Sequence, residues 1–141
     1  MCARSGAGPI GLATLVAARA AGATPIVITD IAEERLAFAK KLVPGVITYK
    51  VQPGLSVEEQ GQRISDAAGG QLKLAMECTG VESSINTAVH SVKFGSMVFV
   101  IGVGGANYRN IPFTVRHLLH TLSRFETDGR LIRPVHVGDG D

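Results

Sequence analysis

The chain has 141 residues, of which 45% are hydrophobic and 18% charged, and its formal net charge is +2. This composition is typical of one globular domain with its own core and excludes a disordered chain. The small charge excludes nucleic acid as an expected partner, and the longest apolar run, Pro9 to Ala18, is too short to span a membrane. Cys2 and Cys78 lack C-x-x-C spacing, which favours a reducing, cytoplasmic setting.

The first predicted helix follows a glycine-rich turn. Residues 6–11 read GAGPIG, a G-x-G-x-x-G pattern. Pro9 suits the first helical position, because its φ is fixed and its missing N–H is not needed there. We expect the helix to run to about Ala21 and to end at Gly22. Residues 25–29 then form a short, β-branched run that is typical of a strand buried on both faces.

The following segments alternate between helix and strand. Residues 30–33 have the form of a capping box, which predicts that a helix starts at Asp30, and Pro44-Gly45 stops it. The later elements are expected as a strand over 46–50, a helix over 56–68 capped by Ser56, a strand over 72–78, a helix over 82–93 and a strand over 96–101. This alternation predicts an α/β fold, a Rossmann-like, doubly wound parallel sheet with right-handed crossovers.

Both ends of the chain depart from this pattern. Residues 1–5 are short for a strand, and Arg4 would be costly in a buried central strand, so we expect a truncated first strand. After Phe113 the sequence changes character. We therefore expect an incomplete nucleotide-binding domain over 1–113 and a divergent tail over 114–141, with one amphipathic helix before a loose terminus.

The glycine pattern and the next acid are the strongest functional signal. Gly6, Gly8 and Gly11 are expected to serve the turn, the close approach of a pyrophosphate and the packing of the helix, in that order. Asp30 would accept hydrogen bonds from the adenosine ribose, although it could also serve only as a helix cap. A 2′-phosphate about 4 Å from this carboxylate would cost on the order of 4 kcal/mol at an effective dielectric of about 20, which favours NAD over NADP.

Five segments carry a resemblance: residues 6–11, 29–31, 35–40, 77–85 and 98–104. Together they resemble the coenzyme domain of zinc-type medium-chain dehydrogenases, in the branch of sorbitol, xylitol and L-arabinitol dehydrogenases. The resemblance implies an oxidoreductase that transfers hydride from a sugar alcohol to NAD, while zinc polarises the substrate alkoxide. The cofactor-binding residues implied by the motif and the resemblance are Gly6, Gly8, Pro9, Ile10, Gly11, Asp30, Ile31, Arg35, Cys78, Thr79, Ile101, Gly102 and Val103.

The chain also departs from the family. The family's zinc ligands and substrate-binding domain precede the glycine motif, and no matching ligand set occurs here, since His117 and His120 lack a third ligand. We therefore expect the NAD(H)-binding domain of a polyol dehydrogenase without catalytic residues, a metal site or turnover of its own.

Three alternatives remain open. The first is a non-catalytic NAD-binding or interaction module that forms a homo-oligomer or joins full-length dehydrogenase subunits. The second is a non-functional truncated product, with a tail read in another frame. The third is a methyltransferase, against which the match over residues 77–80 argues.

Overall fold

The computed structural model describes residues 2–104, which form a five-stranded sheet between two layers of helices. The elements are β1 (Cys2–Ser5), α1 (Pro9–Ala20), β2 (Ile26–Asp30), α2 (Glu33–Leu42), β3 (Ile47–Lys50), α3 (Val57–Ala67), β4 (Leu72–Glu77), α4 (Glu82–Ser91) and β5 (Val92–Val100). All neighbouring strands are parallel, in the order β3-β2-β1-β4-β5. The predicted Rossmann-like α/β fold is confirmed. The tail expected over 114–141 lies outside the described residues.

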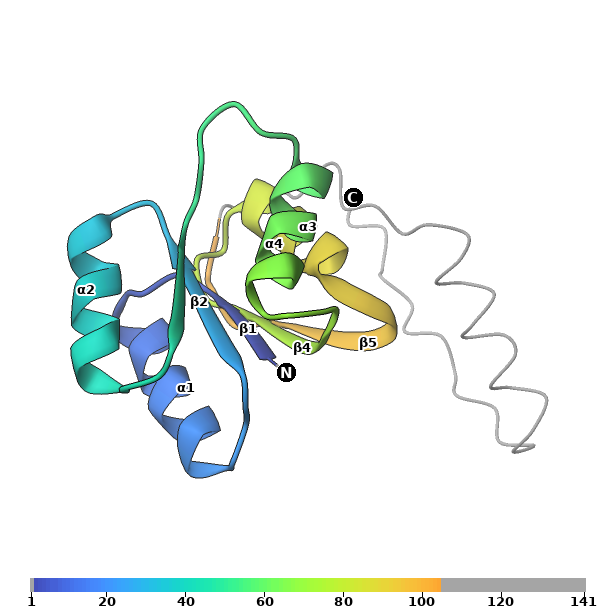
Figure 1. The fold of residues 1–141 in the computed structure, drawn as a ribbon. Helices are drawn as coiled ribbons and strands as arrows, with labels where there is room; N and C mark the ends of the chain where they lie inside the picture. Colours follow the sequence, from blue (N-terminus) through green and yellow to red (C-terminus); the bar gives the residue numbers. More distant parts are fainter. Residues whose placement is uncertain (1, 105–141) are drawn as a thin grey trace, which may run out of the picture.

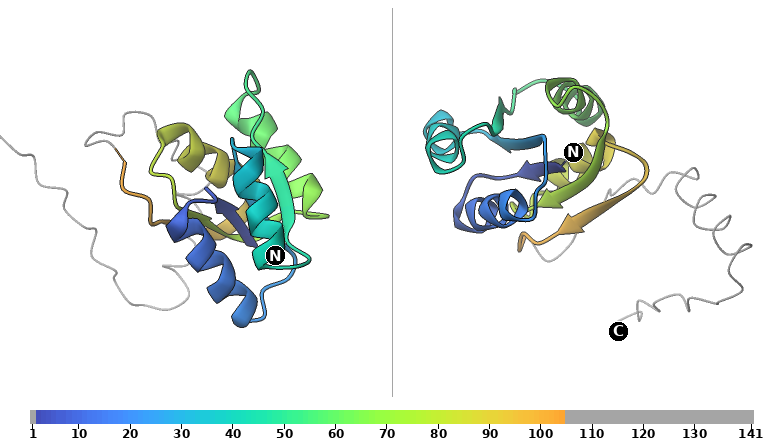
Figure 2. Two further views of the ribbon diagram at one scale, coloured as in Figure 1. Left: turned by 90° about the vertical axis from the view of Figure 1, so that its left-hand side faces the viewer. Right: turned by 60° about the horizontal axis from the view of Figure 1, so that its bottom comes forward.

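The sheet has a core on each face, because successive strand residues point to opposite sides. Ile26 and Ile28 pack toward α1 and α2, in a cluster that includes Leu15 and Leu36. Val27 belongs to the opposite cluster. The remaining members of that second cluster include Ala3, Ile64, Ala75 and Ala88. Figure 1 shows the resulting layers, with α1 and α2 on one side of the sheet and α3 and α4 on the other. Within the described residues, β3 and β5 are the two sheet edges (Figure 2).

The N-terminal segment forms the central strand, and at four residues this strand is short, as expected. β1 pairs with β2 from Cys2 to Ser5 and with β4 from Ala3 to Ser5. Parallel pairing on both sides satisfies the backbone whatever the side chains are, and this explains why a strand forms here. The predicted cost of Arg4 is nevertheless present. Arg4 is 0% exposed, its Nη1 donates to Met76 Sδ at 3.0 Å, and its Nε and Nη2 have no partner within residues 2–104.

The two predicted capping boxes differ in whether the polar side chain accepts from the N–H groups of the helix that follows it. The capping box predicted at residues 30–33 is wrong, because Asp30 is the last residue of β2 and α2 begins at Glu33, with Ala32 as an N-cap without a side-chain bond. The box at Ser56 is confirmed: its hydroxyl accepts from Glu59 N at 3.2 Å, and the Glu59 carboxylate accepts from Ser56 N at 3.0 Å.

The last helix is shorter, and the last strand longer, than predicted. α4 ends at Ser91 because Val92 already has extended backbone, so the helix predicted through Lys93 is wrong there. β5 begins at Val92 rather than at residue 96, and Gly95, with φ of +78°, lies inside it. The pairing of β4 with β5 shifts register between Leu72 and Leu74. None of the helices within residues 2–104 is long and apolar enough to cross a membrane.

Candidate functional site

The carboxyl ends of β1, β2 and β4 lie side by side at the same end of the parallel strands. After β1 the chain builds β2 and β3 on one side, and later β4 and β5 on the other. The neighbours β1 and β4 therefore mark the point where the winding direction reverses. Ligands of open parallel sheets bind outside the carboxyl ends of the strands at such a switch point.

The three glycines of the turn after β1 have distinct structural duties. Gly6 has a φ of +91°, and a Cβ there would lie 2.7 Å from Thr79 Cγ2. A Cβ at Gly11 would lie 1.8 Å from the Gly6 carbonyl oxygen, so only glycine lets α1 approach the turn this closely. A Cβ at Gly8 would meet nothing within 4 Å. Gly6 and Gly11 are thus required by the protein's own packing, whereas the space beside Gly8 is open to a ligand.

The N-terminus of α1 offers donors to an anion. Pro9 is the first helical residue, the first turn has no acidic residue, and the N-cap Gly8 has no side chain to occupy the free N–H groups. In the first turn of a helix, N–H groups such as those of Ile10 and Gly11 have no carbonyl partner within the helix. These donors and the helix dipole favour a phosphate at this position. The ladder of α1 begins with the bond from Leu12 N to the Gly8 carbonyl at 2.9 Å.

Asp30 connects the glycine turn to α2. Its Oδ2 accepts from Ala7 N at 2.7 Å, and its Oδ1 accepts from Ala32 N at 2.8 Å. Arg35 Nη1 lies 3.8 Å from Asp30 Oδ2 in an ion pair whose arginine side chain is 61% exposed. A carboxylate can accept about four hydrogen bonds, so Asp30 retains capacity for a ligand hydroxyl. Asp30 therefore both shapes the glycine turn and presents an acceptor to the cavity.

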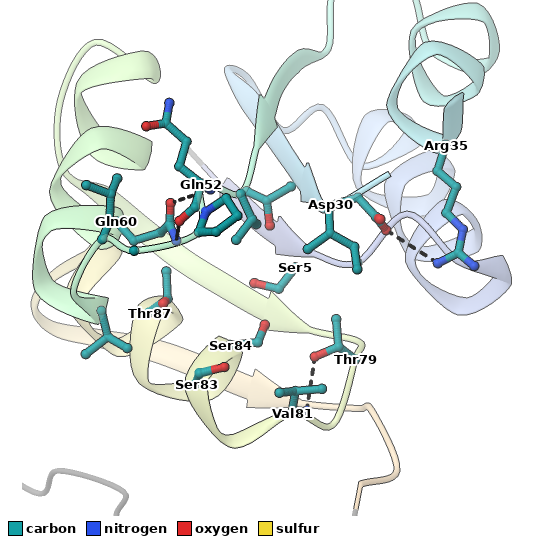
Figure 3. A pocket seen from close by; sticks show the side chains of 18 residues that line it. Ser5, Asp30, Arg35, Gln52, Gln60, Thr79, Val81, Ser83, Ser84 and Thr87 are labelled. Atoms are coloured by element: carbon teal, nitrogen blue, oxygen red, sulfur yellow. Dashed lines mark hydrogen bonds and ion pairs between the residues drawn. The ribbon is translucent and has the colours of Figure 1, made fainter. Parts of the chain in front are cut away.

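A cavity of about 510 Å³ lies between these strand ends and the helices α3 and α4. Its wall consists of Ser5, Gly6, Thr29, Asp30, Ile31, Arg35, Val51, Gln52, Pro53, Gly54, Leu55, Val57, Gln60, Thr79, Val81, Ser83, Ser84 and Thr87. In Figure 3, Asp30 and Arg35 lie on one side of the cavity, Gln52 and Gln60 lie on the other, and the side chains of α4 close it below. This volume is in the range of small-molecule and cofactor sites.

Gln60 anchors the loop that forms the far wall of the cavity. Its Oε1 accepts from Tyr49 Oη and from Gln52 N, each at 3.1 Å, and its Nε2 donates to the Gln52 carbonyl at 3.2 Å. Gln60 is itself buried. These three bonds tie the connection between β3 and α3 to both elements, so this wall of the cavity is formed before any ligand arrives.

Glu77 organises the turn from β4 into α4. The side chain is 0% exposed. Its Oε2 accepts from Gly80 N at 2.9 Å, and its Oε1 accepts from Thr79 N at 2.8 Å, from the Thr79 hydroxyl and from Ser84 Oγ at 3.0 Å. Within residues 2–104 no cation pairs with it. Hydrogen bonds near the N-terminus of α4 therefore stabilise the buried carboxylate.

The loop after β5 packs closely on the same turn. The Glu77 carbonyl accepts from Ile101 N at 2.7 Å and from Gly102 N at 2.9 Å. A Cβ at Gly102 would lie 2.1 Å from Gly80 N, and one at Gly80 would lie 2.6 Å from the Val103 carbonyl carbon. The backbones after β4 and β5 thus touch beside Ile101, Gly102 and Val103, which the resemblance implies as cofactor-binding residues.

The predicted cofactor residues occupy three neighbouring places. Those that line the cavity are Gly6, Asp30, Ile31, Arg35 and Thr79. Those in the turn and the first turn of α1 are Gly8, Pro9, Ile10 and Gly11, and those after β5 are Ile101, Gly102 and Val103.

Cys78 lies behind the glycine turn. Its Sγ is 3.6 Å from Thr14 Oγ1 in α1, and a Cβ at Gly11 would lie 3.8 Å from Cys78 Cβ. Burial raises the pKa of the Cys78 thiol from its usual value, while the hydrogen bond with Thr14 acts in the opposite direction. This cysteine is therefore a protonated packing group at ordinary pH.

Sequence reasoning missed the polar groups that the helices α3 and α4 bring to the cavity. Gln60 and Ser84 are the main ones. Glu77, at the end of β4, belongs to the segment 77–85 that carries the resemblance, but no role was predicted for it. A glutamine buried at a helix position that should be apolar is the signal that could have identified Gln60. Within the described residues, no group of three or more His, Cys, Asp or Glu side chains could hold a metal ion.

Comparisons with known proteins agree with this geometry. The family model described as zinc-binding dehydrogenase matches residues 9–127. L-arabinitol 4-dehydrogenase of Aspergillus oryzae is 64% identical over 118 residues, which are 77% of this chain and 31% of that protein. Sorbitol dehydrogenase of Mus musculus is 33% identical over 108 residues, which are 76% of this chain and 29% of that protein. The chain thus spans about 30% of the length of these relatives.

A solved structure with a similar fold was determined with a bound dinucleotide. The zinc-binding dehydrogenase of Sinorhizobium meliloti 1021, bound to NADP, is 25% identical to the chain with a TM-score of 0.70. The match covers 85% of this chain and 34% of that protein.

Proposed function

The chain belongs to the zinc-binding dehydrogenase family, and on that premise we propose that it is an NAD(H)-binding domain of a polyol dehydrogenase. The relatives' names, L-arabinitol 4-dehydrogenase and sorbitol dehydrogenase, support a sugar alcohol as the substrate class of the complete enzyme. When bound, NAD accepts the hydride, and the protein contributes binding and orientation.

One observation carries the proposal: the open space at Gly8 lies at the N-terminus of α1, beside a cavity that contains Asp30. The pyrophosphate would take the N–H groups of Ile10 and Gly11. The adenosine ribose would donate its hydroxyls to Asp30, and the base would enter the cavity beyond it. The backbone at 101–103 would face the nicotinamide end. Each part of the dinucleotide therefore has a group of matching chemistry.

We propose NAD rather than NADP as the cofactor. A 2′-phosphate about 4 Å from the Asp30 carboxylate would cost on the order of 4 kcal/mol at an effective dielectric of about 20. Arg35 offsets part of this repulsion because its positively charged guanidinium lies 3.8 Å from Asp30 Oδ2. The net preference for NAD is therefore expected to be at least about tenfold rather than the thousandfold of an unpaired carboxylate.

Calorimetric titration of the 141-residue chain with NADH and with NADPH tests the cofactor. We expect saturable NADH binding and NADPH binding at least about tenfold weaker. Arg35→Ala should widen the difference, because the cation that offsets the carboxylate is gone, and exposed Arg19→Ala serves as the matched control. Equal affinity for the two cofactors would contradict the role of Asp30, and no affinity for either would contradict the proposed function.

A second part of the proposal concerns association. Met97 and Phe99 on β5 are 61% and 47% exposed, and β5 is an edge of the described sheet. Exposed apolar strands are typical contact surfaces, which supports self-association or association with full-length subunits in the cytoplasm. Sedimentation at increasing concentration tests this. A single monomeric species in the presence of full-length dehydrogenase would contradict it.

A further inference from the structure

We propose that Ser84, fixed by Glu77, is a specificity-determining residue that selects the 6-amino group of adenine in the cavity. This inference rests on the proposed NAD(H) site. It concerns the base, whereas the glycine turn and Asp30 concern the pyrophosphate and the ribose.

The Ser84 hydroxyl directs its proton toward Glu77. Ser84 Oγ donates to Glu77 Oε1 at 3.0 Å. As a carboxylate, Glu77 can only accept, and the other groups that contact its carboxylate oxygens, from Thr79 and Gly80, are donors as well. Glu77 is 0% exposed, so no solvent competes with Ser84 as a donor to this carboxylate. The Ser84 hydroxyl therefore presents only lone pairs to the cavity that it lines.

Three other hydroxyls that line the cavity differ from that of Ser84. Thr79 Oγ1 also donates to Glu77, but it accepts from Val81 N at 3.1 Å, so one of its two lone pairs is already used. Thr29 Oγ1 donates to the Arg4 carbonyl. Ser83 lies on the exposed rim of α4, whereas Ser84 is half-buried. Thr29 also lines the cavity with a committed proton, but it lies in β2 next to Asp30. Ser84 thus combines a committed proton with a position on the α4 side of the cavity.

The adenine base would occupy the part of the cavity beyond Asp30. With the ribose at Asp30, the remaining cavity is bounded by the loop 51–55, by α3 and by the first turns of α4. Val51, Leu55 and Val81 supply apolar surface for a flat ring. A ring that occupies this space presents one edge to α4, and an acceptor there favours a ligand N–H over a ligand carbonyl. Among purine bases, adenine carries an amino group at position 6 and hypoxanthine carries a carbonyl.

The test compares NADH with reduced nicotinamide hypoxanthine dinucleotide, which differs at the base. For the unmodified chain we expect the 6-oxo compound to bind about tenfold more weakly, the size expected when a site's hydrogen bond to the ligand is lost and two acceptors face each other. In Ser84→Ala the ratio should fall to within about twofold, because the acceptor is gone. Ser84→Thr keeps the hydroxyl and should keep the ratio. Ser96→Ala is the matched control that should leave it unchanged, because Ser96 is also half-buried and donates to a carbonyl, that of Leu72 at 3.4 Å, but does not line the cavity.

The outcomes separate the inference from the proposed function. NADH binding with a ratio near one, a preference for the 6-oxo compound, or an unchanged ratio in Ser84→Ala would overturn the role of Ser84 and leave the NAD(H) site in place. Loss of the ratio in Ser96→Ala as well would mean that the ratio does not depend on the hydroxyl in the cavity, and would overturn it too. A chain that binds neither dinucleotide would overturn the proposed function, and this inference with it.

Discussion

Replacing Arg4 with methionine is expected to stabilise the protein, an uncommon result for a fully buried position. Arg4 is 0% exposed in the central strand, and its Nε and Nη2 find no acceptor within the described residues. Each buried polar atom without a partner costs about 1–3 kcal/mol, so two of them cost about 2–6 kcal/mol. Methionine has a similar length and no polar hydrogen. Arg4→Met should therefore raise the free energy of unfolding by at least about 2 kcal/mol.

Urea and thermal unfolding followed by circular dichroism measure this difference. A gain of about 2 kcal/mol corresponds to a rise in Tm of about 8 °C or more in a domain of this size. Exposed Arg19→Met is the matched control and should change stability by less than about 0.5 kcal/mol. A less stable Arg4→Met protein would refute the reasoning, because it would mean that the guanidinium makes favourable contacts that outweigh its desolvation.

The dependence of this gain on pH follows from the shifted pKa of Arg4. Burial lowers the pKa of the guanidinium, and the charge of nearby Cys2 and Cys78 thiolates would raise it. The folded state therefore holds the proton less tightly than the unfolded state. The destabilisation caused by burying the charged Arg4 guanidinium is therefore complete at every pH below its folded-state pKa. It declines only as pH rises through that pKa. The advantage of Arg4→Met should thus be constant from acidic to neutral pH, and a gain confined to acidic pH would contradict this.

Three further predictions concern the glycine turn, the cap of α3 and the cysteines. Gly11→Ala should destabilise the fold by at least about 2 kcal/mol in urea unfolding, because its Cβ would lie 1.8 Å from a backbone oxygen; unchanged stability would contradict the packing. Ser56→Ala should cost about 1 kcal/mol, with Ser83→Ala as control. Hydrogen bonds from Ser56 lower the pKa of Glu59, so the stabilisation by this capping box should be lost as pH falls through the lowered pKa of Glu59; a pH-independent cap would contradict this. Burial raises the pKa of both Cys2 and Cys78, so iodoacetamide at neutral pH should modify the folded chain more slowly than the urea-unfolded chain, and equal rates would contradict their burial.

The fold was predictable because its signals are local. Glycine and proline mark the ends of most elements, and a β-branched run such as Pro25 to Thr29 has no reasonable alternative to a buried strand. The central strand was harder to judge. The desolvation cost of Arg4 can be read from its position, but the pairing of β1 with two neighbours depends on segments far away in the sequence.

The site was predictable where a single segment builds it. The glycine turn has its expected geometry, because one stretch of chain supplies both the turn and the helix it opens. Asp30 illustrates the limit. Its spacing to Glu33 imitates a capping box, yet one of its oxygens accepts from distant Ala7. The wall formed by Gln60 and Ser84 could not be predicted, since it exists only where α3 and α4 meet the sheet.

Titrating the chain with NADH, in parallel with its Gly8→Ala variant, tests the nucleotide site most directly. The added Cβ would meet no protein atom within 4 Å, and Gly8 has an ordinary φ of −76°, so the variant should fold like the unmodified chain. The methyl group would nevertheless occupy the space that a pyrophosphate needs. We expect saturable binding of one NADH per chain, weakened at least about tenfold in a Gly8→Ala protein with unchanged circular dichroism. Equal binding by both proteins, or none by the unmodified chain, would contradict it.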